Sequence, residues 1–304
     1  MSDRRRGVLL GLTAYFIWGL FPLYWPLLEP AGAVEILANR IVWCLAVVLL
    51  LLLSARRWSW IRPLLRDRRR LGLLVLAGFV IAVNWGIYIY GVNSGHVVET
   101  SLGYFINPLL TVALGVLVLG ERLRLVQWLA VGLGAVAVVV LTVDYGRLPW
   151  IALLLAASFG TYGLVKKTVG IGPVESLTVE TSALFVPAVV FLVVLQASGR
   201  NTFATHGPGH AALLAATGVI TAVPLLAFGG SANRVPLSWL GIMQYLTPAM
   251  QFLLGILVFH EAMPPPRWIG FGLVWLGLLV LTFDSIWAAS RRTPAADVVP
   301  AEAH

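Results

Sequence analysis

Residues Ser101–Arg122 read SLGYFINPLLTVALGVLVLGER, and an altered copy, GIMQYLTPAMQFLLGILVFHEA, occupies Gly241–Ala262. The two stretches align without a gap at an offset of 140 residues. Coincidences of Leu and Val carry little weight in so apolar a chain, whereas proline, tryptophan and acidic residues at one fixed offset indicate an internal duplication. The residues matched in this way are Pro108 with Pro248, Glu121 with Glu261, Trp128 with Trp268, Thr142 with Thr282, and Asp144 with Asp284.

Each copy also carries polar residues at positions i, i+3 and i+7, a spacing that places them on one face of a helix. A proline accompanies each set, and because it removes a backbone hydrogen bond, the freed carbonyl needs a partner or a water-lined cavity. We interpret the two stripes as the lining of a shared cavity; the alternative is that they hydrogen-bond neighbouring helices around a kink. The residues assigned to this lining are Tyr104, Asn107, Thr111, Gln244, Tyr245, Thr247 and Gln251.

The composition is that of an integral membrane protein. Of the 304 residues, 59% are apolar and 11% are charged, against about 25% charged in an average soluble protein. The net charge of +8 comes from basic residues that lie between apolar runs, which indicates orientation in a membrane rather than nucleic-acid binding. Ten runs are long enough for a span of about 20 residues: 7–28, 34–53, 71–92, 98–119, 126–144, 148–166, 175–196, 210–230, 236–259 and 267–288.

Lysine and arginine are distributed unevenly over the predicted loops. With the N-terminus inside, 17 of them lie on the inner side and three on the outer side, so the positive-inside rule predicts two cytoplasmic termini. The offset places the first five spans on the last five, and five is odd, so the second half enters the membrane from the opposite side. The sequence therefore predicts an all-α membrane protein with ten transmembrane helices in two inverted five-helix repeats, residues 1–144 and 145–290, followed by a disordered cytoplasmic tail, 291–304.

Charged residues inside the spans are scarce because each costs roughly 2.5–3.5 kcal/mol at a helix centre. Arg40 and Glu180 are two of them, and they correspond at the offset of 140. Their depths differ by roughly 12 Å along the membrane normal, so we expect each to pair locally, Arg40 with Glu99 near the outer side. We interpret the two pairs as half-gates; the alternative is that the charges snorkel to the interface. The candidate partners of Glu180 are Lys166, Lys167 and Arg234.

The third predicted span adds Asn84 and Tyr88 on one face, with Trp85 beside it. We assign all three to the cavity, where the tryptophan could stack on a planar or cationic solute. The alternative is that Asn84 hydrogen-bonds a neighbouring helix and the aromatic rings fill the core.

Two other sets of residues are given packing roles. Glu121 and Glu261 stand at helix ends, where we expect each to be solvated or to contact the first turn of the next helix. Four glycines in spans 5 and 10 are expected to let these helices approach closely: Gly132, Gly134, Gly270 and Gly272.

Several chemistries lack their sequence signatures. There is no G-x-x-x-x-G-K-[ST] loop for ATP, no spacing typical of a metal site and no catalytic constellation, so we predict neither an enzyme nor a cofactor. We then expect an ion gradient to drive transport, unless the protein is a facilitator that uses no energy source. If transport is coupled to protons, Glu99 and Glu180 are the expected proton carriers. The expected partners are a small-molecule substrate and the lipid bilayer, with the chain acting as a monomer or a homodimer.

Six segments together resemble one family. They are GVLLGLTAYFIWGLFPLYW at Gly7–Trp25, NWGIYIYGVN at Asn84–Asn93, ETSLGYFINPLL at Glu99–Leu110, LGERLRLVQWLAV at Leu119–Val131, ASFGTYGLVKK at Ala157–Lys167 and TAVPLLAF at Thr221–Phe228. The chain from Gly7 to about Trp287 resembles the RarD group of EamA-type exporters in the drug/metabolite transporter superfamily, whose members are often labelled chloramphenicol-sensitivity proteins.

This resemblance implies a bacterial inner-membrane permease that exports a small metabolite or drug through a central cavity by alternating access. An importer or facilitator of the same fold, and a membrane scaffold or enzyme, remain the alternatives. The chain departs from the family pattern at two places. His260-Glu261 stands where Gly-Glu is expected, and Met263-Pro264-Pro265-Pro266 replaces a short polar turn.

Overall fold

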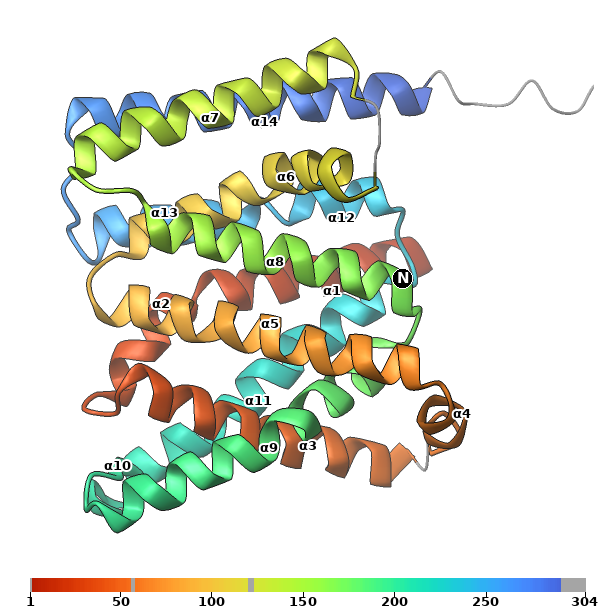
Figure 1. The fold of residues 1–304 in the computed structure, drawn as a ribbon, viewed down its shortest axis with the longest axis vertical. Coiled ribbons are helices and arrows are strands. Elements are labelled where there is room, and N and C mark those ends of the chain that lie inside the picture. The colour runs from red at the N-terminus through yellow and green to blue at the C-terminus, as the bar shows by residue number, and fades with distance from the viewer. Residues whose placement is uncertain (1, 56–57, 120–122, 291–304) are drawn as a thin grey trace, which may run out of the picture. The chain divides into compact units, whose positions relative to one another are not determined.

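The computed structural model describes residues 2–55, 58–119 and 123–290 (Figure 1). Glu121, Arg122 and the predicted tail lie outside these ranges. Within them, the regular structure is helical throughout. The helices are α1 (Asp3–Gly19), α2 (Phe21–Tyr24), the 3-10 helix η1 (Trp25–Leu28), α3 (Ala33–Ala55), α4 (Ile61–Arg66), α5 (Arg68–Asn93), α6 (Val97–Leu119), α7 (Leu125–Tyr145), α8 (Trp150–Val169), α9 (Pro173–Ala197), α10 (Thr202–Thr205), α11 (Gly207–Ala232), α12 (Leu237–Met243), α13 (Leu246–Leu257) and α14 (Pro265–Ser290).

The helices match the predicted apolar runs closely. Among the described residues, eight spans are long and apolar enough to cross a membrane, and nine if α1 is counted together with α2 and η1. The apolar part of α8, Trp150–Lys166, is shorter than these. The chain is therefore a multi-pass membrane protein, and a total of ten spans stays a prediction.

The first predicted span, 7–28, is not one straight helix. It bends by 42° between α1 and the segment formed by α2 and η1. Pro22 and Pro26 stand in the first turns of α2 and η1, where they lack the N–H groups that an uninterrupted helix would need. The bend was not predicted from the sequence, although Pro22 and Pro26 are its sequence signal.

The ninth predicted span, 236–259, is also interrupted. Gln244 and Tyr245 separate α12 from α13. Pro248 has no N–H to donate to the carbonyl of Gln244, four residues earlier, so the helix cannot run through this point without loss. Its counterpart Pro108 behaves differently, since α6 continues through it.

The chain divides into two compact units, and each unit draws on both predicted repeats. The first unit comprises residues 1–107 and 149–263. At its centre α3 packs against α9 and α11, α5 packs against α8 and α9, and α1 packs against α11 and α13. A Cβ at Gly218 of α11 would lie 2.4 Å from the carbonyl of Trp43 in α3, so this crossing brings two backbones into contact. Gly78 of α5 approaches the backbone of Glu180 in α9 in the same way, with 3.0 Å to the carbonyl oxygen.

The second unit, residues 108–148 and 264–304, contains α7 and α14 side by side (Figure 1). Arg124, just before α7, pairs with Asp284 near the end of α14 at 2.5 Å. Asp144, near the end of α7, pairs with Arg267 near the start of α14 at 2.8 Å. The two helices are therefore antiparallel, with an ion pair close to each end.

The glycines of these helices meet the prediction only in part. A Cβ at Gly270 would lie 2.5 Å from Leu141 of α7, so this glycine permits the expected approach. Gly134 instead approaches Leu109 of α6. The prediction was wrong for two other positions, around which a Cβ would find no atom within 4 Å: Gly132 and Gly272.

Candidate functional site

An arginine lies buried inside the first unit, seven residues from the start of α3. Arg40 is 3% exposed. Its guanidinium carbon lies 3.9 Å from the ring centroid of Trp85, 5.3 Å from that of Trp25 and 5.7 Å from that of Phe21. These distances allow cation–π attraction. The Nε–H group donates a hydrogen bond of 2.9 Å to the hydroxyl of Thr221 on α11.

Three residues around this arginine were not found from the sequence. Phe21 and Trp25 come from α2 and η1, which follow the bend in the first span, and that bend was not predicted from the sequence. Thr221 comes from α11 and carries no signal of its own, because threonines are common in membrane helices. Trp85 was predicted to stack on a solute, but the structure places it against the protein's own guanidinium.

Three predicted cavity residues adjoin the aromatic rings around Arg40. Tyr88 belongs to the same buried cluster as Phe21 and Trp25, and Tyr104 packs against that cluster. The rings of Tyr88 and Tyr104 meet edge to face at 5.7 Å. The Tyr104 hydroxyl donates to Asn84 Oδ1 at 3.3 Å. The amide of Asn84 in turn donates to the carbonyl of Leu155 in α8 at 3.1 Å. Asn84 thus joins two helices, as the packing alternative expected, and also holds a tyrosine next to the arginine.

Hydrogen-bond donors next to Arg40 have no acceptor among the described residues. The indole N–H of Trp25 and the hydroxyl of Tyr88 are both buried without a partner, and these side chains are 0% and 3% exposed. The Nη1 and Nη2 groups of Arg40 likewise have no acceptor in the described part of the chain. The region around the guanidinium is therefore rich in donors and poor in acceptors.

The predicted pair between Arg40 and Glu99 is not formed in this conformation. Glu99 Oε1 accepts a hydrogen bond of 3.2 Å from the backbone N–H of Ile151, in the first turn of α8. The first N–H groups of a helix lack partners within the helix, and the helix dipole favours a negative charge there. In the part of the chain that the structure describes, Arg40 has no carboxylate partner.

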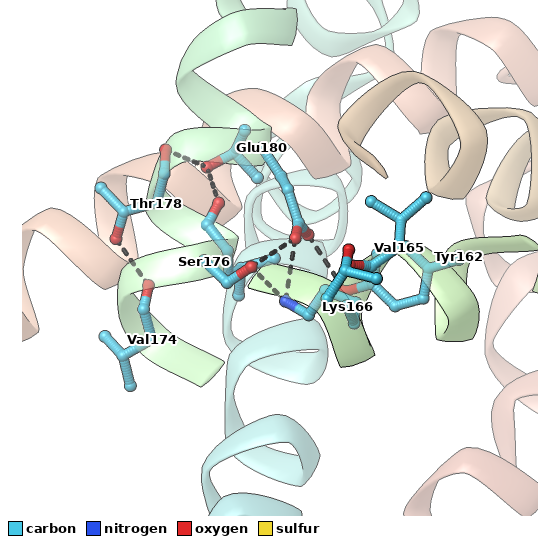
Figure 2. Close-up of polar contacts among 10 residues, drawn as sticks. Tyr162, Val165, Lys166, Val174, Ser176, Thr178 and Glu180 are labelled. Carbon is cyan, nitrogen blue, oxygen red and sulfur yellow. Dashed lines mark hydrogen bonds and ion pairs between the residues drawn. The ribbon is translucent and has the colours of Figure 1, made fainter. Parts of the chain in front are cut away.

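Glu180 occupies the place in α9 that Arg40 occupies in α3, seven residues from the start of the helix. It is 1% exposed. Figure 2 shows three donors that converge on its carboxylate. Lys166 Nζ lies 2.9 Å from Oε1, the Ser176 hydroxyl lies 2.6 Å from the same oxygen, and the Tyr162 hydroxyl lies 3.1 Å from Oε2. Both carboxylate oxygens therefore accept hydrogen bonds within the chain, and the Lys166 ammonium compensates the negative charge.

This cluster contains one of the three partners predicted for Glu180. Lys166 forms the ion pair, whereas Arg234 pairs with Asp3 at 3.1 Å. The Lys166 ammonium also donates to Ser176 Oγ. The side chain of Lys167 lies outside what the structure describes. The sequence did not single out Ser176 and Tyr162, although Ser176 precedes Glu180 by four residues, which places it on the same helix face.

The polar stripe of the second copy contacts the backbone of α1. Thr247 donates to the carbonyl of Tyr15 at 2.8 Å, and Gln251 Nε2 donates to the carbonyl of Trp18 at 3.1 Å. These bonds match the interhelical alternative. Gln251 Oε1 remains buried without a partner among the described residues.

The other predicted lining residues are spread out. Gln244 and Tyr245 lie at the break between α12 and α13. Asn107 ends the first of the two segments that form the first unit, and its Oδ1 is buried and unpartnered within the described chain. Thr111 belongs to the second unit and is exposed. The shared cavity itself stays a prediction.

The chain is similar in sequence to known membrane transporters. The EamA-like transporter family model matches residues 5–143. A RarD protein of Streptomyces exfoliatus is 62% identical over 290 residues, which cover 95% of this chain and 92% of that relative. The chain is a RarD-type member of the EamA-like transporter family.

Two further matches place this RarD-type protein. An uncharacterized transporter of Pseudomonas aeruginosa is 43% identical over 293 residues, 96% of this chain and 98% of the relative. A solved crystal structure covers 92% of this chain and 98% of its own, with a TM-score of 0.58 and 18% identity, which shows a likeness of fold alone. The RarD-type chain is thus a membrane transporter, and the names of its relatives indicate no catalytic activity.

The departure of this RarD-type chain from the family's Gly-Glu pattern has a structural context. His260 has a φ of +54°, in the left-handed region that is costly for residues other than glycine. The next residue, Glu261, accepts hydrogen bonds from the first N–H groups of α6, those of Val97 and Val98. Glu261 therefore contacts a first turn as predicted, but that of an earlier helix in the chain.

We expect His260→Gly to stabilise the RarD-type protein by about 1 kcal/mol, because glycine adopts a positive φ without a Cβ clash. The His260 side chain is exposed, so little packing is lost. Thermal unfolding in detergent measures the effect. His206→Gly is the matched control, since His206 is also exposed but has a φ of −107°. An equal response of the two variants would contradict the assignment of strain to His260.

Proposed function

We propose that the protein is a secondary transporter with ten spans in two inverted five-helix repeats, residues 1–144 and 145–290. The two repeats would rock about a central cavity near the middle of the membrane and expose it to one side at a time. The bent first span and α8 complete the ten. α8 has 20 residues, about 30 Å at 1.5 Å per residue, which is enough to cross a hydrocarbon core.

The helix boundaries support the duplication. An offset of 140 residues carries the first residue of α3, Ala33, onto the first residue of α9, Pro173. It does the same for Val97 of α6 and Leu237 of α12, and for the starts of α7 and α14. The sequence offset is therefore repeated in the three-dimensional elements.

The packing inside the first unit supports the inversion. α3 packs against α11, and its counterpart α9 packs against α5, the counterpart of α11. α1 packs against α11, and its counterpart α8 packs against α5. Two residue contacts show the same exchange, since Gly11 corresponds to Ile151 and Gly91 corresponds to Ser231. A Cβ at Gly11 would meet Ser231, and a Cβ at Gly91 would meet Ile151. Each of these contacts is matched by one between the exchanged partners, which is what the proposed two-fold relation of the repeats requires.

One observation carries the transport proposal: two ionisable residues, Arg40 and Glu180, are buried at the same position, seven residues from the start, of two corresponding apolar helices. Ionisable groups inside a membrane are costly, and they mark pathways for substrates and ions. We propose that the pair Lys166–Glu180 is the inner half-gate and that Arg40 marks the outer half of the pathway. Glu180 and Glu99 remain the proposed proton carriers.

The resemblance to exporters, and the basic residues on the predicted inner side, lead us to propose export across a bacterial inner membrane with both termini cytoplasmic. Oriented vesicles distinguish this from import. Export predicts substrate accumulation in inside-out vesicles and release from right-side-out vesicles. The opposite pattern would identify an importer, and equal equilibration without dependence on a pH gradient would identify a facilitator.

Cysteine accessibility tests the cavity itself. The only native cysteine, Cys44, is 0% exposed, so Cys44→Ala gives a background for single cysteines at positions 104, 107, 244 and 247. We expect a water-soluble maleimide to label the first three, and position 247 more slowly because Thr247 bonds to α1. Adding the reagent to each side in turn should reveal access that changes with substrate. If all four positions stay unlabelled, the cavity is refuted and a scaffold role is favoured.

A further inference from the structure

We propose that Arg40 and the aromatic side chains around it bind the carboxylate of a small monoanionic substrate with an apolar body. This inference rests on the proposed transport function and names the class of solute carried. It follows from the contrast between two equivalent charged sites, from the unpartnered donors beside Arg40 and from the single charge that they surround.

The two charged sites are equivalent in the repeat but differ in how their charges are compensated. Glu180 has Lys166 as its partner, from α8. Arg40 is approached by Trp25, one position from the residue that corresponds to Lys166, and that neighbour is an aromatic ring rather than an acid. A buried charge without a partner is strongly unfavourable. The fold thus supplies the counter-ion at one site and leaves the other to be compensated by a ligand.

Two of the groups at this site can only donate, so they select an acceptor: the indole N–H of Trp25 and the Nη groups of Arg40. The Tyr88 hydroxyl, which can donate as well as accept, is buried and lacks a partner among the described residues, as the Trp25 indole does. A carboxylate accepts about four hydrogen bonds and matches the two-pronged edge of a guanidinium. Because the face of Arg40 stacks on Trp85 and its Nε–H bonds to Thr221, the Nη edge is the part left for such a ligand.

The charge at the site limits the substrate to one negative charge. Arg40 is the buried cation, and the nearest carboxylates that we could assign to it are engaged elsewhere, Glu99 with α8 and Glu180 with Lys166. A phosphate monoester carries close to two charges at pH 7, and one guanidinium would leave part of it uncompensated in an apolar interior. A cationic solute would be repelled. The rings of Phe21 and Trp25 would contact the apolar part of the substrate.

Binding to the full chain in nanodiscs of zwitterionic lipid tests the proposal. The probes are three aromatic carboxylates, phenylacetate, benzoate and indole-3-acetate, with phenylacetamide and phenyl phosphate as the neutral and dianionic comparisons. We expect at least one carboxylate to raise the thermal unfolding temperature, and the amide and the phosphate to act at least tenfold more weakly. A lack of response to all three carboxylates, or tighter binding of the amide or the phosphate, would overturn the proposal.

Three variants separate binding from folding. Arg40→Gln should abolish the response to carboxylate while keeping or raising the unfolding temperature of the ligand-free protein, because it removes an uncompensated buried charge. Tyr88→Phe keeps its ring and Trp25→Phe keeps a smaller aromatic ring; each loses a donor and should weaken binding about threefold to tenfold. Trp58→Phe, an exposed tryptophan, should leave binding unchanged. A ligand-free Arg40→Gln protein that unfolds earlier, with an undiminished carboxylate response, would assign Arg40 a structural role.

The same preparations distinguish a substrate from a lipid and binding from transport. Adding anionic lipid to the nanodisc should have the same effect on the unfolding temperature of the wild type and of Arg40→Gln. If anionic lipid stabilises the wild type but not Arg40→Gln, the guanidinium binds a lipid headgroup and the proposal is overturned. Carboxylate binding without uptake into vesicles would leave the site standing and refute the transport function. Uptake of the amide that Arg40→Gln leaves intact would refute the site and leave the transport function standing.

Discussion

Gly218→Ala is expected to cost the protein at least about 2–3 kcal/mol of stability and most of its folded yield. The added methyl would lie 2.4 Å from the carbonyl carbon and oxygen of Trp43 and 2.9 Å from the nitrogen of Cys44. All three are backbone atoms, so no change of side-chain rotamer can relieve the clash. α11 and α3 would have to move apart, and close approach through small residues is a main source of helix association in membranes.

The measurement is thermal unfolding in detergent, together with the monodisperse fraction on size-exclusion chromatography. Gly272→Ala is the matched control, because a Cβ there meets no atom within 4 Å, and alanine should stabilise that helix by roughly 0.5–1 kcal/mol. Gly78→Ala should fall between them, since its Cβ would lie 3.0 Å from the backbone of Glu180. Equal stability of the Gly218 and Gly272 variants would contradict the close crossing of α11 and α3.

Glu180→Gln is expected to have the second large effect, a loss of roughly 2–3 kcal/mol of stability and of transport. Breaking a buried pair costs about 3–5 kcal/mol when it leaves an uncompensated charge. We expect less here because the Lys166 side chain is 24% exposed, so solvent screens part of its charge. The carboxylate also accepts from Ser176 and Tyr162, and a neutral amide would serve these donors and the ammonium poorly.

A double-mutant cycle measures this effect. Lys166→Gln alone leaves a buried carboxylate, and the double variant Glu180→Gln, Lys166→Gln leaves no charge, so the double variant should regain most of the lost stability. If the pair also serves as a gate, the double variant will be stable but will not transport. Recovery of both stability and transport would show that the pair serves only the fold. Additive losses in the double variant would contradict the pairing itself.

The sequence was sufficient to place the apolar helices and insufficient to describe their breaks. Runs of about 20 apolar residues fix where a span lies, because every backbone group in lipid must bond within its own helix. The break at Gln244 depends on Pro248, while the equivalent Pro108 leaves α6 continuous. The same residue type at equivalent places has two outcomes, so the neighbouring helices decide between them, and one sequence does not reveal those neighbours.

The candidate site was predictable to a similar extent. The rarity of charges in apolar spans singled out Arg40 and Glu180, and depth in the membrane gave Lys166 as one of three candidate partners for Glu180. The surroundings of Arg40 could not be found in this way. They combine a bend at Pro22, a tertiary contact with Thr221 and the attachment of Glu99 to α8. Each is a long-range consequence of packing, so a partner chosen by depth alone was the wrong one for this conformation.

The ion pairs at the ends of α7 and α14 follow the offset of 140 residues for their acids but not for their arginines. Asp144 and Asp284 are counterparts at the offset of 140, but their arginine partners are not: Arg267 corresponds to Gln127, and Arg124 corresponds to Pro264. If the first predicted repeat paired with a second copy of itself, Gln127 would face Asp144. If the second repeat did so, Pro264 would face Asp284. Under the proposed duplication, each repeat therefore depends on the other for the arginine that pairs with its aspartate.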